Sequence, residues 1–201
     1  AGFTYPSRVD DDLRRRLADT AVAAMRAVGF DHGQFNVELF VCADGSIRII
    51  EINPRAAGQF ATLYRDVEGL HLELMGIWLA AGRDPREARR DSPWAEVAGS
   101  IVYRRFDGGP GAVPTPASRA WLAATHPAAR LWLQPTGRRE VEREYRWLGS
   151  HRYAVLNCGA AGHDDLRRLG EECGQRLFGA HGPPLYRSSA AVRKPAKTSV
   201  R

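Results

Sequence analysis

The sequence has few cysteines and no long apolar run. Cys42, Cys158 and Cys173 are an odd number among 201 residues and lack C-x-x-C spacing. This pattern argues against a disulfide framework and a zinc site, and it favours a reducing, cytoplasmic location. No stretch approaches the roughly 18 uncharged apolar residues that a membrane-spanning helix needs. The N-terminus also lacks the basic segment and apolar core of a secretory signal.

Lysine and the familiar catalytic patterns are scarce as well. Only Lys194 and Lys197 occur, and both lie near the C-terminus. No glycine-rich phosphate loop precedes Gly29, and no Ser–His–Asp or Cys–His arrangement is legible. The sequence therefore offers no candidate for a side-chain nucleophile.

The net charge of +6 is concentrated at one end of the chain. Residues 183–201 contain basic but no acidic residues, so the rest of the chain is nearly neutral. A basic segment rich in Ser, Ala and Pro is typical of a disordered tail, and a polyanion-binding arm is the alternative. Nucleic-acid binding would rest on this segment alone, so deleting it should then abolish salt-dependent binding.

Four stretches favour helices. The first carries an apolar stripe at helical spacing, formed by Leu13, Leu17, Ala21, Ala24 and Val28. Asp10 can cap its start, and Gly29 can provide a left-handed cap at its end. Further helical stretches are expected at about 60–81 and at 164–178. Short strands are expected at 97–106, 130–134 and 153–157, with a short helix at 117–125.

A β-hairpin is the clearest structural signal. Two strand-like apolar runs flank the dipeptide Asp44-Gly45. The runs cover residues 34–42 and 46–52. This dipeptide suits a type I′ turn, because both central positions of that turn need positive φ. We therefore predict a two-residue turn in which Ala43 pairs with Ser46.

This register places Glu38 directly opposite Glu51, and Asn36 opposite Asn53. Directly opposed residues have Cβ atoms about 4.5–5.5 Å apart, and like charges there destabilise a sheet. A divalent cation between the carboxylates would remove this repulsion, and Mg²⁺ usually takes one or two carboxylates with phosphate oxygens and water. Three arginines could neutralise them instead: Arg48, Arg55 and Arg65. A three-residue turn would shift the register and separate the two glutamates onto opposite faces.

Residues 29–59 read G-F-D-H-G-Q-F-N-V-E-L-F-V-C-A-D-G-S-I-R-I-I-E-I-N-P-R-A-A-G-Q. This stretch resembles the metal-binding core of the ATP-grasp superfamily, above all its carboxylate–amine ligase and biotin-carboxylase-like branches. The spacing of the E…E-I-N-P-R pattern matches within a residue or so. The preceding Y-P-x-R and the following G-L-H-L-E-L and G-R-D-P segments also look like that family. The resemblance covers residues 1–86 well and 95–180 loosely.

The resemblance implies an α+β fold restricted to the C-terminal half of the family. Residues 1–90 would form the C-terminal ATP-grasp subdomain, with an antiparallel sheet and packed helices. Residues 95–182 would form a smaller α/β lobe, followed by the basic tail at 183–201.

The resemblance also implies roles for particular residues. Glu38 and Glu51 would bridge Mg²⁺ (or Mn²⁺) to the β- and γ-phosphates of ATP, and Asn53 would complete the metal shell. Arg55 would act in catalysis and nucleotide binding by holding the transferring phosphoryl group or the acyl-phosphate with bidentate donors. Ala57 and Gly58 would let backbone amides approach the substrate carboxylate, although a plain turn explains Gly58 nearly as well.

Other conspicuous residues are expected to be structural. His32 lies in the loop before the hairpin and is interpreted as structural rather than as a substrate contact. The tryptophans occur singly, without interleaved basic residues, which favours core positions over a stacking platform. They are Trp78, Trp94, Trp121, Trp132 and Trp147.

The activity implied is an ADP-forming ligase that joins a carboxylate, through an acyl-phosphate, to an amine, with amino-acid-like substrates. A biotin-carboxylase-like or purine-pathway member stays open, as does a non-catalytic docking module that keeps the fold. The lysine-bearing N-terminal half of the ATP clamp is not in this sequence. We therefore expect a piece of a longer protein, with that half supplied in cis or in trans, or a degenerate remnant. The isolated chain should bind Mg-ATP weakly and turn over little. No membrane partner is expected, and a homodimer is left open.

Overall fold

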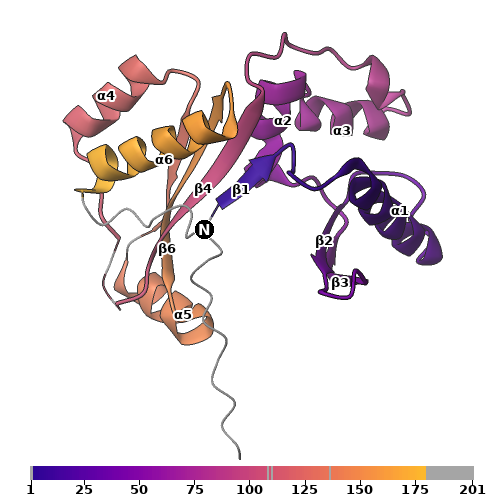
Figure 1. Ribbon diagram of the computed structural model, residues 1–201, viewed down its shortest axis with the longest axis horizontal. Coiled ribbons are helices and arrows are strands. Elements are labelled where there is room, and N and C mark those ends of the chain that lie inside the picture. Colours follow the sequence, from indigo (N-terminus) through magenta and orange to yellow (C-terminus); the bar gives the residue numbers. More distant parts are fainter. Residues whose placement is uncertain (1, 108, 110, 136, 180–201) are drawn as a thin grey trace, which may run out of the picture.

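The computed structural model describes residues 2–107, 109, 111–135 and 137–179, so the predicted tail at 183–201 lies outside the described residues. Two antiparallel sheets and their packed helices make up the fold (Figure 1). The elements are β1 (Gly2–Tyr5), α1 (Asp11–Ala27), β2 (Asn36–Val41), β3 (Ile47–Asn53), η1 (Gly58–Phe60), α2 (Ala61–Glu68), α3 (Leu72–Ala80), η2 (Pro85–Glu87), β4 (Val97–Arg105), α4 (Pro116–Thr125), β5 (Arg130–Leu133), α5 (Arg138–Leu148), β6 (His151–Ala160) and α6 (His163–Phe178). The predicted α+β class is confirmed. No helix within the described ranges has the length and apolar character needed to cross a membrane.

Helix α1 begins and ends where local chemistry predicts. The Asp10 carboxylate accepts a hydrogen bond from the backbone N–H of Leu13 at 2.8 Å, which satisfies a free donor of the first turn. Asp11 and Asp12 follow in that turn, where negative charge complements the helix dipole. Gly29, at φ 73°, turns the chain away after the last residue of the helix.

The predicted helical stretch at 60–81 consists of two helices separated by Gly69. This glycine is buried, has φ 71° and caps α2 in the left-handed conformation. Its carbonyl accepts a hydrogen bond from the backbone N–H of Asp91 at 3.0 Å. The backbone N–H groups of Trp94 and Ala95 both donate to the carbonyl of Asp66 at 3.1 Å. The connector that leads to β4 is therefore fastened to the end of α2.

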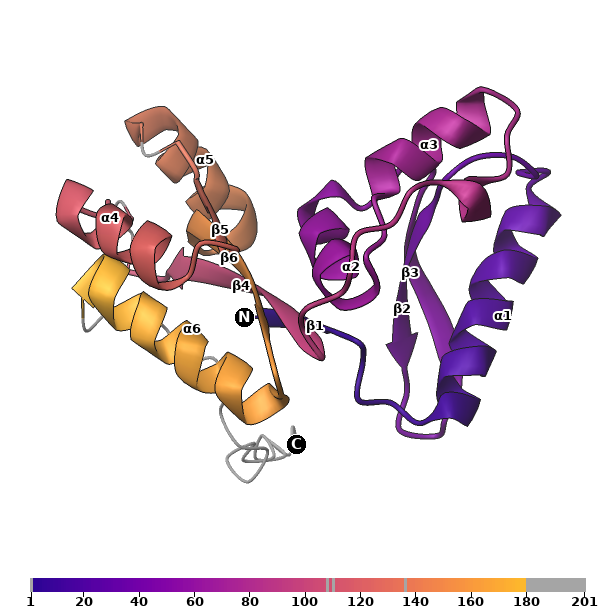
Figure 2. The ribbon, with the colours of Figure 1, turned by 90° about the horizontal axis from the view of Figure 1, so that it is seen from above.

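The larger sheet has the strand order β1-β4-β6-β5, and all its neighbours are antiparallel. Strand β1 was not predicted, and it joins this sheet although it comes from the start of the chain. Helix α6 packs on one face, where the Tyr103 hydroxyl donates to the carbonyl of Gly170 at 3.3 Å. Figure 2 shows α1, α2, α3 and the β2–β3 hairpin grouped apart from α4, α5 and α6, with β1 between them. The boundary proposed between residues 90 and 95 stays a prediction.

The core between this sheet and α6 contains two of the three cysteines. Cys158 and Cys173 are buried, and burial raises the pKa of both thiols, that of Cys173 to about 12. Cys42, at the end of the hairpin, is partly exposed. We expect a thiol reagent at pH 8 to label only Cys42 in the native chain and all three cysteines after denaturation, because the thiolate is the reactive species. Rapid labelling of Cys158 or Cys173 in the native chain, detected by mass spectrometry, would contradict this expectation.

Candidate functional site

The β2–β3 hairpin brings the predicted pairs together. Glu38 lies directly opposite Glu51, and Asn36 lies opposite Asn53. The predicted turn, however, is wrong. The backbone N–H of Cys42 donates to the carbonyl of Ser46 at 2.8 Å, so three residues close the hairpin and Ala43 does not pair with Ser46.

The physical reason is that only Gly45 of the Asp-Gly dipeptide has positive φ, at 78°. A three-residue loop ending in a left-handed glycine is the next most common hairpin connection after the two-residue turns. Taken alone, this loop would place Glu38 opposite Ile50 and separate the glutamates.

A β-bulge restores the register. Leu39 pairs with Ile49, but Glu38 pairs with Glu51, so Ile50 is an extra residue in β3. A bulge of this kind places two residues of one strand opposite one residue of its partner. The extra residue compensates for the longer turn, and both glutamates therefore belong to one face of the hairpin.

Neither glutamate is neutralised by an arginine among the described residues. Both are exposed, and no ion pair found within the described ranges includes either of them. Arg55 donates to the carbonyl of Ala56 at 3.2 Å and to Oδ1 of Asn53 at 3.5 Å, while Arg65 pairs with Asp66 at 3.5 Å. The repulsion between the paired carboxylates is thus left without a compensating charge from these arginines.

The donor set on this face fits a nucleotide-bound magnesium ion. Glu38, Glu51, Asn36 and Asn53 offer hard carboxylate and amide oxygens. No cluster of three or more His, Cys, Asp or Glu side chains suited to a metal occurs in the described part of the chain. The protein would therefore contribute two carboxylates here, and phosphate oxygens and water would complete the shell, as is usual for Mg²⁺.

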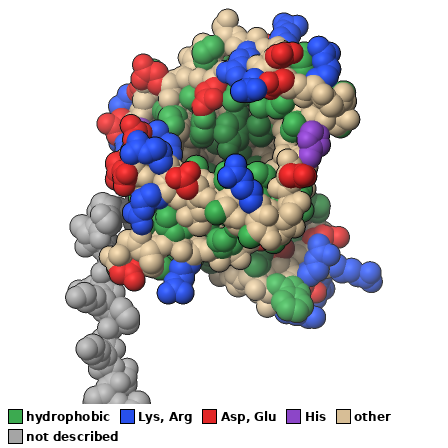
Figure 3. All heavy atoms as spheres, turned by 90° about the vertical axis from the view of Figure 1, so that its right-hand side faces the viewer, with side chains coloured by type: hydrophobic (Ala, Val, Ile, Leu, Met, Phe, Trp, Pro, Cys, Tyr) green, Lys and Arg blue, Asp and Glu red, His purple; other side chains and the backbone are tan. Residues whose placement is uncertain are grey.

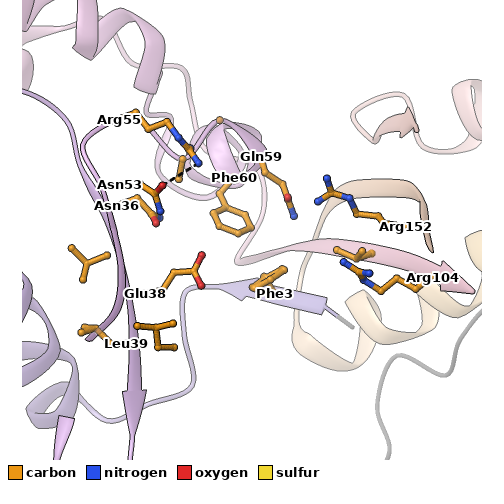
Figure 4. A pocket seen from close by; sticks show the side chains of 15 residues that line it. Phe3, Asn36, Glu38, Leu39, Asn53, Arg55, Gln59, Phe60, Arg104 and Arg152 are labelled. Carbon is orange, nitrogen blue, oxygen red and sulfur yellow. Dashed lines mark hydrogen bonds between the residues drawn. The ribbon is translucent and has the colours of Figure 1, made fainter. Parts of the chain in front are cut away.

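A cavity of about 670 Å³ separates this hairpin face from the larger sheet. Its wall includes Asn36, Glu38, Asn53 and Arg55 on the hairpin side, and Phe3, Arg104 and Arg152 on the sheet side (Figure 4). Glu51 is not among the residues that line it. Ala57 and Gly58, predicted to admit a substrate carboxylate, lie in its wall. Arg104 and Arg152 were not predicted, because the fold brings them to the cavity from strands remote from the hairpin motif.

The loop that follows E-I-N-P-R is held on the larger sheet. The Gln59 side-chain amide donates to Oγ of Ser100 at 3.0 Å. The Asn157 amide, only 1% exposed, donates to the carbonyl of Gln59 at 2.6 Å and to Oγ1 of Thr62 at 2.8 Å. Ser100 and Asn157 are paired residues of β4 and β6. These contacts fix the floor of the cavity to both central strands.

Replacing Asn157 by leucine should destabilise the chain by about 1–3 kcal/mol, because the carbonyl of Gln59 and the hydroxyl of Thr62 lose a buried donor. Urea unfolding measures the change. Thr62→Val is the matched control, since it removes only one of the two acceptors and should cost less. A larger loss for Thr62→Val than for Asn157→Leu would contradict the assigned role of the amide.

The expected structural roles of His32 and of the tryptophans have different outcomes. Nε2 of His32 lies 3.0 Å from the carbonyl of Leu79, a contact that ties the loop before the hairpin to α3 and agrees with a structural role. The expectation that all the tryptophans are core residues is wrong. Trp94, Trp132 and Trp147 are 54%, 41% and 78% exposed.

Comparisons with known proteins agree with this geometry. No family model matches the chain. Carnosine synthase 1 of Gallus gallus is 38% identical over 97 residues, which are 48% of this chain and 10% of that protein. An L-amino acid ligase of Bacillus licheniformis matches 88% of this chain and 43% of its own, with a TM-score of 0.67 and 14% identity. A carboxyaminoimidazole ribonucleotide synthase of Aspergillus clavatus, solved with ATP, matches 87% of this chain and 42% of its own, with a TM-score of 0.55 and 18% identity.

The chain thus spans less than half of the length of each of these proteins. The structural likeness extends across both sheets, because nearly nine-tenths of this chain takes part in it. It agrees with the resemblance carried by the E…E-I-N-P-R hairpin. The chain therefore has the fold of the C-terminal half of the ATP-grasp ligases, of the carboxylate–amine ligase and biotin-carboxylase-like type.

Proposed function

We propose that the chain is the C-terminal half of the catalytic unit of an ATP-dependent, ADP-forming ligase that joins a carboxylate to an amine. In this reaction an oxygen of the substrate carboxylate attacks the γ-phosphorus of ATP, which releases ADP and leaves an acyl-phosphate. The amine nitrogen then attacks the acyl carbon, inorganic phosphate leaves, and the nitrogen loses a proton. No side-chain nucleophile is required.

The observation that carries this proposal is the pair Glu38–Glu51 beside Asn36–Asn53 on one hairpin face, where neither glutamate has an ion pair with another described residue. Mg²⁺, when bound there with ATP, would screen the charge on the phosphoryl oxygens. Glu38, Glu51 and Asn53 would hold it. Arg55 would bind the transferring phosphoryl group, since its guanidinium lies at the cavity wall next to Asn53.

The names of the similar proteins support the substrate class. One is an L-amino acid ligase and one is a carnosine synthase, and a third was solved with ATP. Amino-acid-like carboxylates and amines are therefore the substrates that we propose for this chain. We propose the cytoplasm as the place where it acts.

The hairpin surface supports the proposed need for the N-terminal half of the clamp. Large apolar side chains remain exposed on the hairpin and just before it: Phe35, Phe40, Val41, Ile49, Ile50 and Ile52. Seen from the side of α1 and the hairpin, the molecule is hollowed, with hydrophobic side chains gathered in the hollow (Figure 3). Contiguous exposed apolar surface of this kind marks an interaction site. We propose that the other half of the clamp, in cis or in trans, covers it.

A protein that also contains the N-terminal half provides the test. ADP release should require both a carboxylate and an amine, and an amide product should accumulate in proportion to ADP. Calorimetry on the isolated chain should show weak ATP binding that depends on Mg²⁺. ADP release that needs neither substrate, or undiminished ATP binding in EDTA, would argue against the ligase. A partner affinity that is retained without any ATP-dependent reaction would favour the docking module.

A further inference from the structure

The cavity wall opposite the hairpin contains two arginines that face each other across strands. Arg104 of β4 and Arg152 of β6 are directly paired, and the ladder is irregular between Tyr103 and Arg104. Directly opposed like charges destabilise an antiparallel pair. The sheet therefore holds two guanidinium groups together at the point where it meets the cavity.

Neither guanidinium is neutralised within the described part of the chain. Arg104 donates to the neutral hydroxyl of Ser150 at 2.8 Å, and Nε of Arg152 is buried without a hydrogen-bond partner among the described residues. The Glu144 carboxylate lies nearby but accepts from the backbone N–H of Arg152, at 2.7 Å, and contacts His151. The adjacent Arg105, in contrast, forms an ion pair with Asp107. A buried guanidinium N–H without an acceptor is costly, so the pair is set up to receive an anion.

The arginine pair lies on the opposite side of the cavity from the nucleotide-binding residues. Figure 4 shows Arg104 and Arg152 on the sheet side, while Glu38, Asn53 and Arg55 lie across the cavity. Arg152 also borders an adjoining hollow of about 260 Å³ lined by Gln59, Trp132 and Gln134. The phosphates and the carboxylate to be activated would be held on the hairpin side. A second anionic group would therefore meet the arginines.

We propose that Arg104 and Arg152 bind the carboxylate of the amine substrate, so that the nucleophile in this ligase is an amino acid rather than a simple amine. This proposal rests on the proposed function. Two guanidinium groups offer planar, bidentate donors that match a carboxylate. Binding the carboxylate on the sheet side would leave the amine free to point towards the hairpin side.

Binding to the 201-residue chain, without ATP or metal, tests the proposal. Calorimetry measures the binding of three kinds of probe: the common L-amino acids, the corresponding amino acid amides and inorganic phosphate. At least one amino acid should bind about tenfold or more tightly than its amide. Arg152→Gln and Arg104→Gln should each remove that preference while leaving the affinity for the amide unchanged. Arg139→Gln, on exposed helix α5, is the control and should behave like the parent chain.

A thermal melt separates binding from a merely structural role. Arg152→Gln relieves the like-charge pair, so its melting temperature without ligand should equal or exceed that of the parent. The preferred amino acid should raise the melting temperature of the parent but not of the variant. Should Arg152→Gln fail to fold, Arg104→Gln serves the same comparison.

Equal binding of amino acids and their amides, absence of amino-acid binding, or phosphate as the sole arginine-dependent ligand would overturn the subsite. These outcomes are independent of Mg-ATP binding at the hairpin. Failure of the proposed ligase function would appear in ATP binding and ADP release, and failure of the arginine subsite would appear in amino-acid binding without ATP. Separate measurements therefore distinguish the two.

Discussion

Glu51→Gln is expected to lower ligase activity by about 10²–10³-fold in a protein that contains both halves of the clamp, the range for losing one preorganised electrostatic contact to the transition state. The substitution keeps the size of the side chain but removes one of the two carboxylates that would hold Mg²⁺. The isolated chain should also lose Mg²⁺-dependent ATP binding in calorimetry. Glu73→Gln, in exposed helix α3, is the matched control and should leave both properties unchanged.

The same substitution should have the opposite effect on stability without metal. Glu38 and Glu51 repel each other across the hairpin, so removing one charge should maintain or raise the free energy of unfolding in EDTA. Loss of activity combined with unchanged or higher stability would identify the pair as a functional site. Full activity of Glu51→Gln would refute the assignment of the metal to this hairpin.

Gly69→Ala is expected to destabilise the chain by about 3–5 kcal/mol, a value that combines left-handed strain with a backbone clash. The φ of this glycine is 71°, which disfavours any side chain. A Cβ atom there would lie 1.9 Å from the carbonyl oxygen of Asp91, and that oxygen belongs to the connector between the two groups of elements. Urea unfolding at constant temperature measures the loss.

Gly82→Ala isolates the conformational part of this effect. Gly82 has φ 70°, but a Cβ atom added there meets no heavy atom within 4 Å. Its substitution should therefore cost only about 1–2 kcal/mol, the strain of the left-handed conformation itself. Similar losses for the two variants would show that the connector moves aside without penalty at Gly69.

The helices and the hairpin could be predicted because their signals are local. Asp10 and Gly29 mark the ends of α1, and apolar alternation marks β2 and β3. The bulge also leaves a local signal in the sequence of β3. Apolar residues occupy 47 and 49 and then 50 and 52, so the alternation changes phase between Ile49 and Ile50. A change of phase inside a strand is what an extra residue produces.

The remaining features depend on contacts between distant segments. Strand β1 has only four residues, and it is a strand because β4 offers an edge to pair with. Arg104 and Arg152 meet only because β4 and β6 pair in one register. Helix α5 is an exception, because Val141, Tyr145 and Leu148 recur there at helical spacing, which is a local signal for a helix. No local pattern could have placed Arg104 and Arg152 at one cavity.

The pairing of β1 with β4 has a consequence for how the protein can be divided. Residues 1–90 expressed alone would carry the glutamate hairpin but leave Gly2–Tyr5 without the neighbour that it pairs with. Residues 95–182 expressed alone would expose the edge of β4, and an exposed strand edge promotes self-association. A minimal fragment for biophysical work must therefore retain both segments, and cleavage within the connector should leave the two pieces associated.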